Sequence, residues 1–130
     1  MAGPLILAYN LDGEALDRLR GLCDAQGLTL RVVSPWEYGA PVGALAGIPV
    51  ARQPENGPGV GFGDPMLLMC HLLSPQLDAF LQGMRDHKVP RIALKAILTP
   101  HNVTWTSRQL RDELAREHEA VQQGRKREHA

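Results

Sequence analysis

The chain has 130 residues, the size of one domain, and its formal net charge is zero because 14 Lys and Arg residues balance 14 Asp and Glu residues. This balance predicts no nucleic-acid partner, and 44% hydrophobic against 22% charged residues is typical of a globular protein, not a disordered one. Two cysteines without a CxxC spacing argue against a disulfide scaffold or a structural zinc site and favour a reducing compartment. With neither a basic leader nor a long apolar run near the start, we expect a cytoplasmic protein without a membrane partner.

The first part of the chain predicts a strand, a helix and a second strand. Residues 5–9 form a compact apolar run, typical of a buried strand. Asp12 is a candidate N-cap for a helix, and Gly27 is a plausible stop for it. Apolar and polar side chains alternate over residues 28–31, and residues 28–33 are rich in β-branched side chains, which indicates a strand. Residues 36–47 have apolar side chains at helical spacing, but their glycines and proline favour no more than a short turn of helix.

A Gly/Pro-rich connector at residues 51–65 leads into the second part of the chain. Its alternating glycines do not predict a phosphate-binding loop, because such a loop needs a strand before it and a helix after it. Here a strand follows, at residues 66–70, and Ser74 then begins a helix with proline at its first position. Residues 91–98 predict a fourth strand.

The last helix is predicted from Ser107 onward, because Thr106-x-x-Gln109 resembles a capping box. Its apolar stripe is thin, and we expect the chain to be disordered over residues 124–130.

The two parts of the chain resemble each other. A shift of 61 residues places the apolar run 5–9 on the run 66–70. Two tandem βαβ units with right-handed crossovers predict a ferredoxin-like α/β sandwich with a four-stranded antiparallel sheet and an additional C-terminal helix. A flavodoxin-like parallel sheet is the alternative. The predicted organisation is a single duplicated domain over residues 1–123, divided into a first unit, 1–50, the connector, and a second unit with its helix, 66–123.

The predicted first and third strands are apolar on both faces. Side chains alternate along a strand, so an open antiparallel sheet should instead show polar residues on its solvent face. A bare patch of this kind would be a liability. We therefore expect the second sheet face to be covered by the added helical pieces or, failing that, by a second copy of the chain in a homodimer.

Over residues 66–120 an apolar strand and a helix precede a second strand, a polar turn and a further helix. The distinctive positions in this stretch are Lys95, Thr99, Pro100, Asn102 and Trp105, followed by Leu110 and Leu114. In these residues the chain resembles a known family, the small bacterial proteins grouped as domain of unknown function 3783. His101 departs from the family pattern, which favours a small polar residue there. The resemblance implies the fold and implies no activity, because the family is uncharacterised.

Lys95 stands out because it interrupts an apolar strand. Alternation of side chains predicts that it lies on the face opposite the crossover helices. In one reading, its stem covers apolar surface and its ammonium reaches solvent or a carboxylate. In the other, its ammonium anchors an anionic ligand.

The turn after this strand supplies polar side chains just before a helix start, where free N–H groups and the helix dipole favour anions. The other reading is that these side chains only satisfy the turn and cap the helix, and that Trp105 anchors the helix to the core. The candidate ligand-binding residues are Lys95, Thr99, His101, Asn102 and Trp105.

No catalytic motif, metal site or cofactor site is predicted. HExxH, P-loop and Ser-His-Asp patterns are missing from the sequence, and neighbouring strand residues such as Cys70 and His71 face opposite ways. The leading hypothesis is a non-catalytic module that binds a small anionic ligand or regulates a partner. The alternative is a homodimeric assembly protein that pairs through its sheet face. A third hypothesis is an enzyme that acts on an anionic small molecule through Lys95 with His101.

Overall fold

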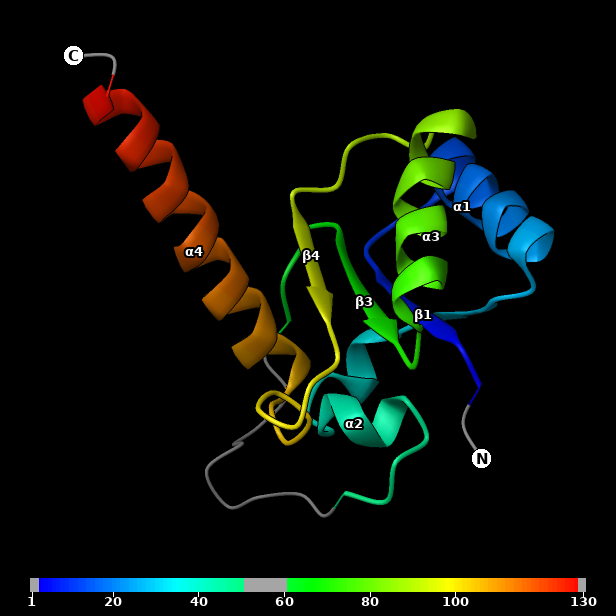
Figure 1. Ribbon diagram of the computed structural model, residues 1–130. Helices are drawn as coiled ribbons and strands as arrows, with labels where there is room; N and C mark the ends of the chain where they lie inside the picture. The colour runs from blue at the N-terminus through cyan, green and yellow to red at the C-terminus, as the bar shows by residue number, and fades with distance from the viewer. Residues whose placement is uncertain (1–2, 51–60, 129–130) are drawn as a thin grey trace.

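The protein, seen here as a computed structural model of which residues 3–50 and 61–128 are described, has a central sheet with helices on both faces (Figure 1). Its elements follow one another as β1 (Leu5–Tyr9), α1 (Gly13–Gln26), β2 (Thr29–Val32), the 3-10 turn η1 (Pro35–Glu37), α2 (Val42–Leu45), β3 (Met66–Cys70), α3 (Ser74–Asp86), β4 (Leu94–Ile97) and α4 (Ser107–Glu128). None of the described helices is both long enough and apolar enough to cross a membrane.

The sheet has four strands in the order β2-β1-β3-β4. The two central strands, β1 and β3, are antiparallel, with Leu7 opposite Leu68. Each edge strand is parallel to its neighbour, so that β2 runs with β1 and β4 runs with β3. The sheet is therefore mixed.

The predicted ferredoxin-like sandwich, with two tandem βαβ units and a four-stranded antiparallel sheet, is wrong. In that fold each helix carries the chain past one strand position, which leaves room for the first strand of the other unit. Here the central pair of β1 and β3 is formed as predicted, but β2 lies beside β1 instead of β3, and β4 lies beside β3 instead of β1. Residues 33–65 separate β2 from β3, so no tight hairpin draws these two strands together. The all-parallel alternative also fails, because the central pair is antiparallel.

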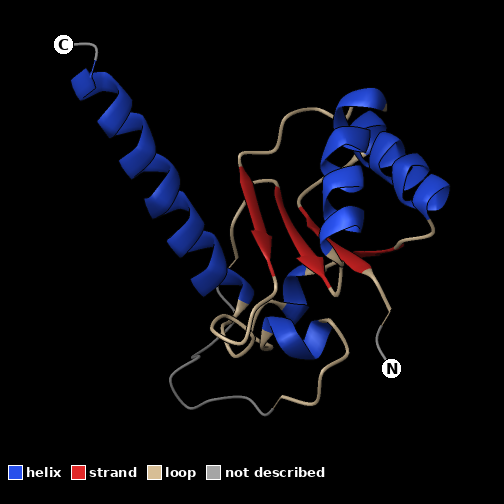
Figure 2. Cartoon of the chain, in the orientation of Figure 1, coloured by secondary structure: helices blue, strands red, loops and turns tan. Residues whose placement is uncertain are grey.

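The helices α1 and α3 stand together on one face of the sheet (Figure 2). The apolar stripes of both helices reach the alternate side chains of β1 and β3, and burial of this apolar surface is the main force that holds the layers together. This first core is made of Ile6, Ala8, Leu19, Leu22, Cys23, Leu28, Leu67, Met69, Phe80, Met84, Val89 and Ile92.

The second face of the sheet is covered by the chain itself. The segment from η1 to α2 and the first turns of α4 bury the other alternate side chains of the central strands, in a core made of Leu7, Tyr9, Val33, Tyr38, Val42, Leu45, Ala46, Met66, Leu68, Cys70, Leu94 and Leu110. The prediction that the added helical pieces cover this face is confirmed. The homodimer through the sheet face is predicted on the assumption that this apolar surface is bare. That assumption does not hold, because these strand residues are buried within the chain.

Several local signals in the sequence are confirmed. Asp12 is the N-cap residue of α1, and Gly27 ends that helix in the left-handed conformation, with φ of 70°. The capping box of α4 is formed in both directions. The backbone N–H of Thr106 donates to Oε1 of Gln109 at 2.8 Å, and the backbone N–H of Gln109 donates to Oγ1 of Thr106 at 3.2 Å.

Other boundaries differ from prediction. The fourth strand is shorter than residues 91–98, and the N-cap of α3 is Leu73, one residue before the predicted Ser74. The helix α4 continues past residue 124 to Glu128. Residues 51–60 of the predicted connector and residues 129–130 of the predicted tail lie outside the described residues.

Candidate functional site

The polar turn after β4 is held together by Asn102, whose side chain is buried. Its Oδ1 accepts a hydrogen bond from the backbone N–H of Thr99 at 2.9 Å, and its Nδ2 donates to the carbonyl of Ile97 at 3.0 Å. The Thr99 hydroxyl oxygen accepts in return from the backbone N–H of Asn102 at 3.2 Å. These bonds satisfy the turn internally, so the contacts support the reading in which these two side chains shape the turn.

His101 and Trp105 pack against each other at the surface of the same turn. Their ring centroids are 5.1 Å apart in an edge-to-face arrangement. Trp105 also packs partly against the second core, and its carbonyl accepts a hydrogen bond from the backbone N–H of Val42 at 2.7 Å. The turn therefore joins β4, α2 and α4, which is a structural role.

Lys95 lies on the opposite face from the predicted one. In the sheet register it pairs with Leu67, which belongs to the first core, under α1 and α3. Leu94 belongs to the second core instead. The reason is that β4 is an edge strand: its second-core side is covered by α4 and must be apolar, whereas its other side is only half covered and tolerates a lysine.

The five predicted ligand-binding residues are consequently divided between two places. Lys95 borders a groove beside α3, and its ammonium Nζ donates to the carbonyl of Ile92 at 2.6 Å. Thr99, His101, Asn102 and Trp105 lie together in the turn that follows β4. In the described part of the chain no hydrogen bond or ion pair joins Lys95 to any of these four, so the pairing of Lys95 with His101 that the enzyme hypothesis needs is not formed.

The groove that Lys95 borders lies between α3 and β4 and has a volume of about 550 Å³. We call it the α3–β4 groove. Its floor is apolar, since Met84, Val89 and Ile92 are at most 9% exposed. The full lining is Leu81, Met84, Arg85, Val89, Arg91, Ile92 and Lys95.

Three cationic side chains border this groove: Arg85 from α3, Arg91 from the loop and Lys95 from β4. None of the three makes an ion pair with a carboxylate among the described residues. Burial, and then the positive charge of Arg91, lower the pKa of the Lys95 ammonium. The groove therefore concentrates positive charge beside an apolar floor.

Sequence reasoning found Lys95 but missed Arg85 and Arg91. Arg85 follows Leu81 by four residues and so shares its helix face, and Arg91 is two residues beyond the buried Val89. This spacing indicates that both arginines lie near apolar residues. It does not predict a shared groove unless one knows that α3 and β4 lie side by side.

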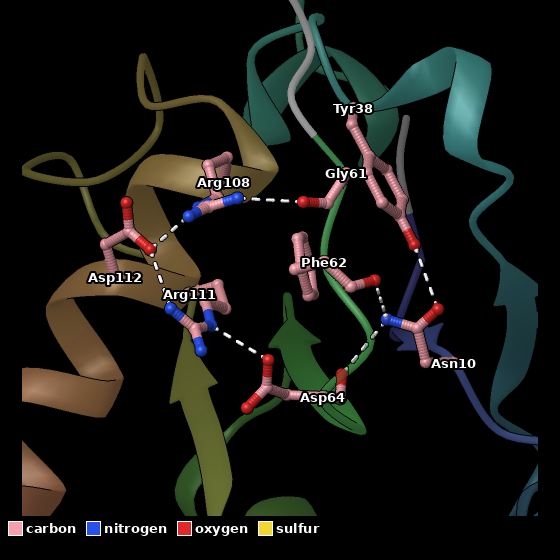
Figure 3. A network of polar contacts seen from close by, with 8 residues as sticks. All are labelled: Asn10, Tyr38, Gly61, Phe62, Asp64, Arg108, Arg111 and Asp112. Atoms are coloured by element: carbon pink, nitrogen blue, oxygen red, sulfur yellow. Dashed lines mark hydrogen bonds and ion pairs between the residues drawn. The ribbon is translucent and has the colours of Figure 1, made fainter.

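A second cluster of polar contacts, shown in Figure 3, holds residues 61–64 against the rest of the protein. Asn10 takes a left-handed conformation, with φ of 57°, and its Nδ2 donates to the carbonyls of Phe62 at 2.9 Å and Asp64 at 3.1 Å. The ring of Phe62 stacks on Tyr38 with centroids 4.8 Å apart. This part of the cluster fastens the start of β3 to the end of β1.

The charged part of the cluster comes from α4. Arg111 forms ion pairs with Asp64 at 2.9 Å and Asp112 at 3.0 Å, and Arg108 pairs with Asp112 at 2.8 Å (Figure 3). Arg108 also donates to the carbonyl of Gly61 at 2.8 Å. Every charged group in this cluster has a partner within the chain, so its role is structural.

The hydrogen bond from Arg111 holds the pKa of the Asp64 carboxyl below its usual range. A carboxyl group with a lowered folded-state pKa stabilises the fold above its unfolded pKa of about 3.9, and this stabilisation is lost as pH falls through the lowered value. We expect Arg111→Gln to reduce stability at pH 7 by less than about 1 kcal/mol, since the pair is partly exposed. The difference from wild type should shrink below pH 4 in urea titrations.

The matched control is Arg116→Gln, which removes the ion pair with Glu113 at a position where the arginine side chain is 73% exposed. This change should alter stability less than Arg111→Gln at pH 7. A gap between Arg111→Gln and wild type that stays constant from pH 7 to pH 2 would show that the carboxylate of Asp64 is not involved.

Both thiols are buried and free. Burial raises the pKa of Cys70 to about 12 and that of Cys23 to about 11, so neither is a nucleophile at neutral pH. His71 contacts the carbonyl of Ala46 through Nε2 at 3.1 Å. Within the described ranges, no group of three or more His, Cys, Asp or Glu residues is arranged to hold a metal ion.

We expect iodoacetamide to alkylate the native protein at pH 8 more than about a hundredfold more slowly than the urea-unfolded chain, because the thiolate fraction and access are both reduced. Mass spectrometry at timed intervals measures the two rates. Rapid modification of Cys70 in the native state would contradict the burial of β3 described above.

Fold and site together define a small α+β domain with a mixed sheet and a cationic groove at one edge. Within the chain, residues 65–121 match the model of a family described as Domain of unknown function (DUF3783). The match confirms the resemblance over β3, α3, β4 and most of α4, and it includes all residues of the α3–β4 groove. Comparison with curated proteins and with solved structures found no match.

Proposed function

We propose that the protein is a non-catalytic binding module whose α3–β4 groove takes an anionic ligand. The observation that carries the proposal is the set of three cations, Arg85, Arg91 and Lys95, that border one groove without a carboxylate partner in the described part of the chain. Asp64 borders a neighbouring hollow together with Arg91, but Arg111 already holds it in an ion pair. An anion in the groove would supply the missing counter-charge.

The position of Lys95 supports this ligand class. Its ammonium is half-buried and donates to one carbonyl, that of Ile92, so two of its three N–H donors face the groove or solvent. Burial and Arg91 both disfavour the charged form, and a bound anion would reverse that effect. Hydrogen bonds between charged groups are stronger than neutral ones, so the anion would gain more here than in an uncharged groove.

The lining of the groove supports binding over catalysis. It consists of four apolar residues, two arginines and one lysine. Lys95 is the one lining residue among those described that could act as a nucleophile or a general base, and no carboxylate, imidazole, thiol or hydroxyl lines the groove to act with it.

The test is an amide-shift titration of the intact protein with phosphate, butanoate and ATP. We expect the shifts to concentrate on residues 81–95 and to leave residues 99–107 unmoved. Lys95→Met and Arg91→Gln should each weaken binding about tenfold, because hydrogen bonds to charged groups contribute about 1.5–3 kcal/mol. Arg20→Gln, which removes an exposed charge on α1 away from the groove, is the matched control and should bind like wild type.

Two outcomes would overturn the proposal. One is the absence of any shift with all three anions at millimolar concentration. The other is a response confined to residues 99–107, which would place the anion at the start of α4. Thermal unfolding of each variant shows whether lost binding comes from lost structure.

A further inference from the structure

We infer that the ligand of the α3–β4 groove joins an aliphatic chain to its anionic head, as a medium-chain carboxylate does. This inference rests on the proposed function and narrows it. The walls and floor of the groove are aliphatic side chains: Leu81, Met84, Val89 and Ile92. The three cations border the same groove, so charge and apolar surface are offered to a single ligand.

The groove offers no aromatic ring. The chain has two Trp, two Tyr and two Phe residues, all of which are described, and none lines the groove. Tyr9, Tyr38 and Phe62 pack against one another on the second core, and Phe80 is wholly buried. A nucleobase would find no aromatic face on which to stack, and stacking is the usual source of its affinity. An aliphatic chain needs only apolar contact, which this lining provides.

Exposure of the lining points to the same class of ligand. Leu81 is 37% exposed on the groove side of α3, although it neighbours the wholly buried Phe80. The Lys95 stem extends along the same edge, with its ammonium held at the carbonyl of Ile92. A volume of about 550 Å³ lies within the range of small-ligand sites, roughly 300–1,000 Å³. An alkyl chain over Leu81, with its head at the cations, would cover apolar surface that now faces water.

The test uses the intact protein and the series butanoate, hexanoate, octanoate and decanoate, each below its micelle-forming concentration, with isothermal calorimetry. We expect the dissociation constant to fall about fourfold for each added methylene, which corresponds to about 0.8 kcal/mol per buried CH₂. Octylammonium, which has the same chain with the opposite charge, should bind at least tenfold more weakly than octanoate. ATP should bind more weakly than decanoate.

Two variants distinguish the contribution of the ligand's alkyl chain to affinity from that of its anionic head. Leu81→Asn should reduce the gain per methylene while leaving butanoate almost unchanged. Lys95→Met, which keeps an apolar stem, should weaken every member of the series by the same factor and preserve the gain per methylene. Arg20→Gln again serves as the control and should reproduce the wild-type series, and a melting curve for each variant reports its folding.

The outcomes distinguish this inference from the proposed function. If all four carboxylates bind equally, or if ATP binds more tightly than decanoate, the aliphatic ligand is wrong and the anion-binding groove stands. Octylammonium binding as tightly as octanoate would also overturn the inference. If no anion binds, the proposed function fails together with it.

Discussion

Replacing Phe80 by alanine is expected to lower the free energy of unfolding by about 3–5 kcal/mol. Phe80 is wholly buried in the first core, where α3 packs on the central strands. Its removal forfeits the burial of a large ring and leaves a cavity that the flanking helices can only partly close. Since small domains have a total stability of about 5–15 kcal/mol, this single change would consume a large part of it.

Urea denaturation followed by circular dichroism measures the effect. Leu81→Ala is the matched control, because Leu81 is the next residue on α3 but is 37% exposed. It should cost about 1 kcal/mol or less, as changes at exposed positions do. Equal losses for the two variants would mean that α3 does not face the sheet through Phe80.

The second large effect is expected at Gly43, in the short helix α2. A Cβ built at this position would lie 2.7 Å from the carbonyl oxygen of Val103 and 2.2 Å from a methyl carbon of the same residue. The backbone N–H of Gly43 also donates to that carbonyl at 2.9 Å. A side chain can rotate away, but a hydrogen-bonded backbone cannot, so Gly43→Ala must push α2 off the turn before α4. We expect a loss of about 3 kcal/mol, at the upper end of overpacking costs.

Gly21→Ala provides the contrast. Gly21 lies in α1, and a Cβ there would meet nothing within 4 Å. Alanine should stabilise that helix by about 0.5–1 kcal/mol through its higher helix propensity. Opposite signs for the two substitutions in urea titrations are the expected result. A neutral Gly43→Ala would contradict the close contact between α2 and the residue 103 carbonyl.

Local sequence signals predicted much of the secondary structure, because those signals depend on neighbouring residues only. The apolar run at 5–9 and its counterpart at 66–70 became β1 and β3 with the predicted bounds. Gly27 ends α1 because it tolerates a positive φ, and Thr106 caps α4 through bonds that span three residues. None of these outcomes requires knowledge of the rest of the fold.

The order of the strands could not be obtained in this way. A right-handed crossover is compatible with a strand placed one or two positions away, and both placements bury the same apolar residues of β1 and β3. In the observed order β2 and β4 form opposite edges of the sheet, and the segment from η1 to α2 packs on its second face. The choice depends on packing between segments that are far apart in sequence.

The candidate site likewise depends partly on local sequence signals and partly on packing between distant segments. The sequence alone marks Lys95 as unusual, but the structure places it on the other face of the sheet and beside other residues than those predicted. Alternation assigns residues to two faces but does not say which face receives the helices. At the edge strand β4, α4 takes the side of Leu94, which leaves Lys95 on the side of α3 beside Arg85 and Arg91.

The presence of the strands and helices, the end of α1 and the capping box of α4 follow from the spacing and conformational preference of nearby residues, so the amino-acid sequence alone predicts them. The mixed sheet, the burial of its second face and the grouping of three cations in one groove arise only when distant segments pack together. Those features depend on which apolar surfaces meet across the core. Which surfaces meet depends on the total apolar area buried when all segments pack together, and no single stretch of the chain contains that information.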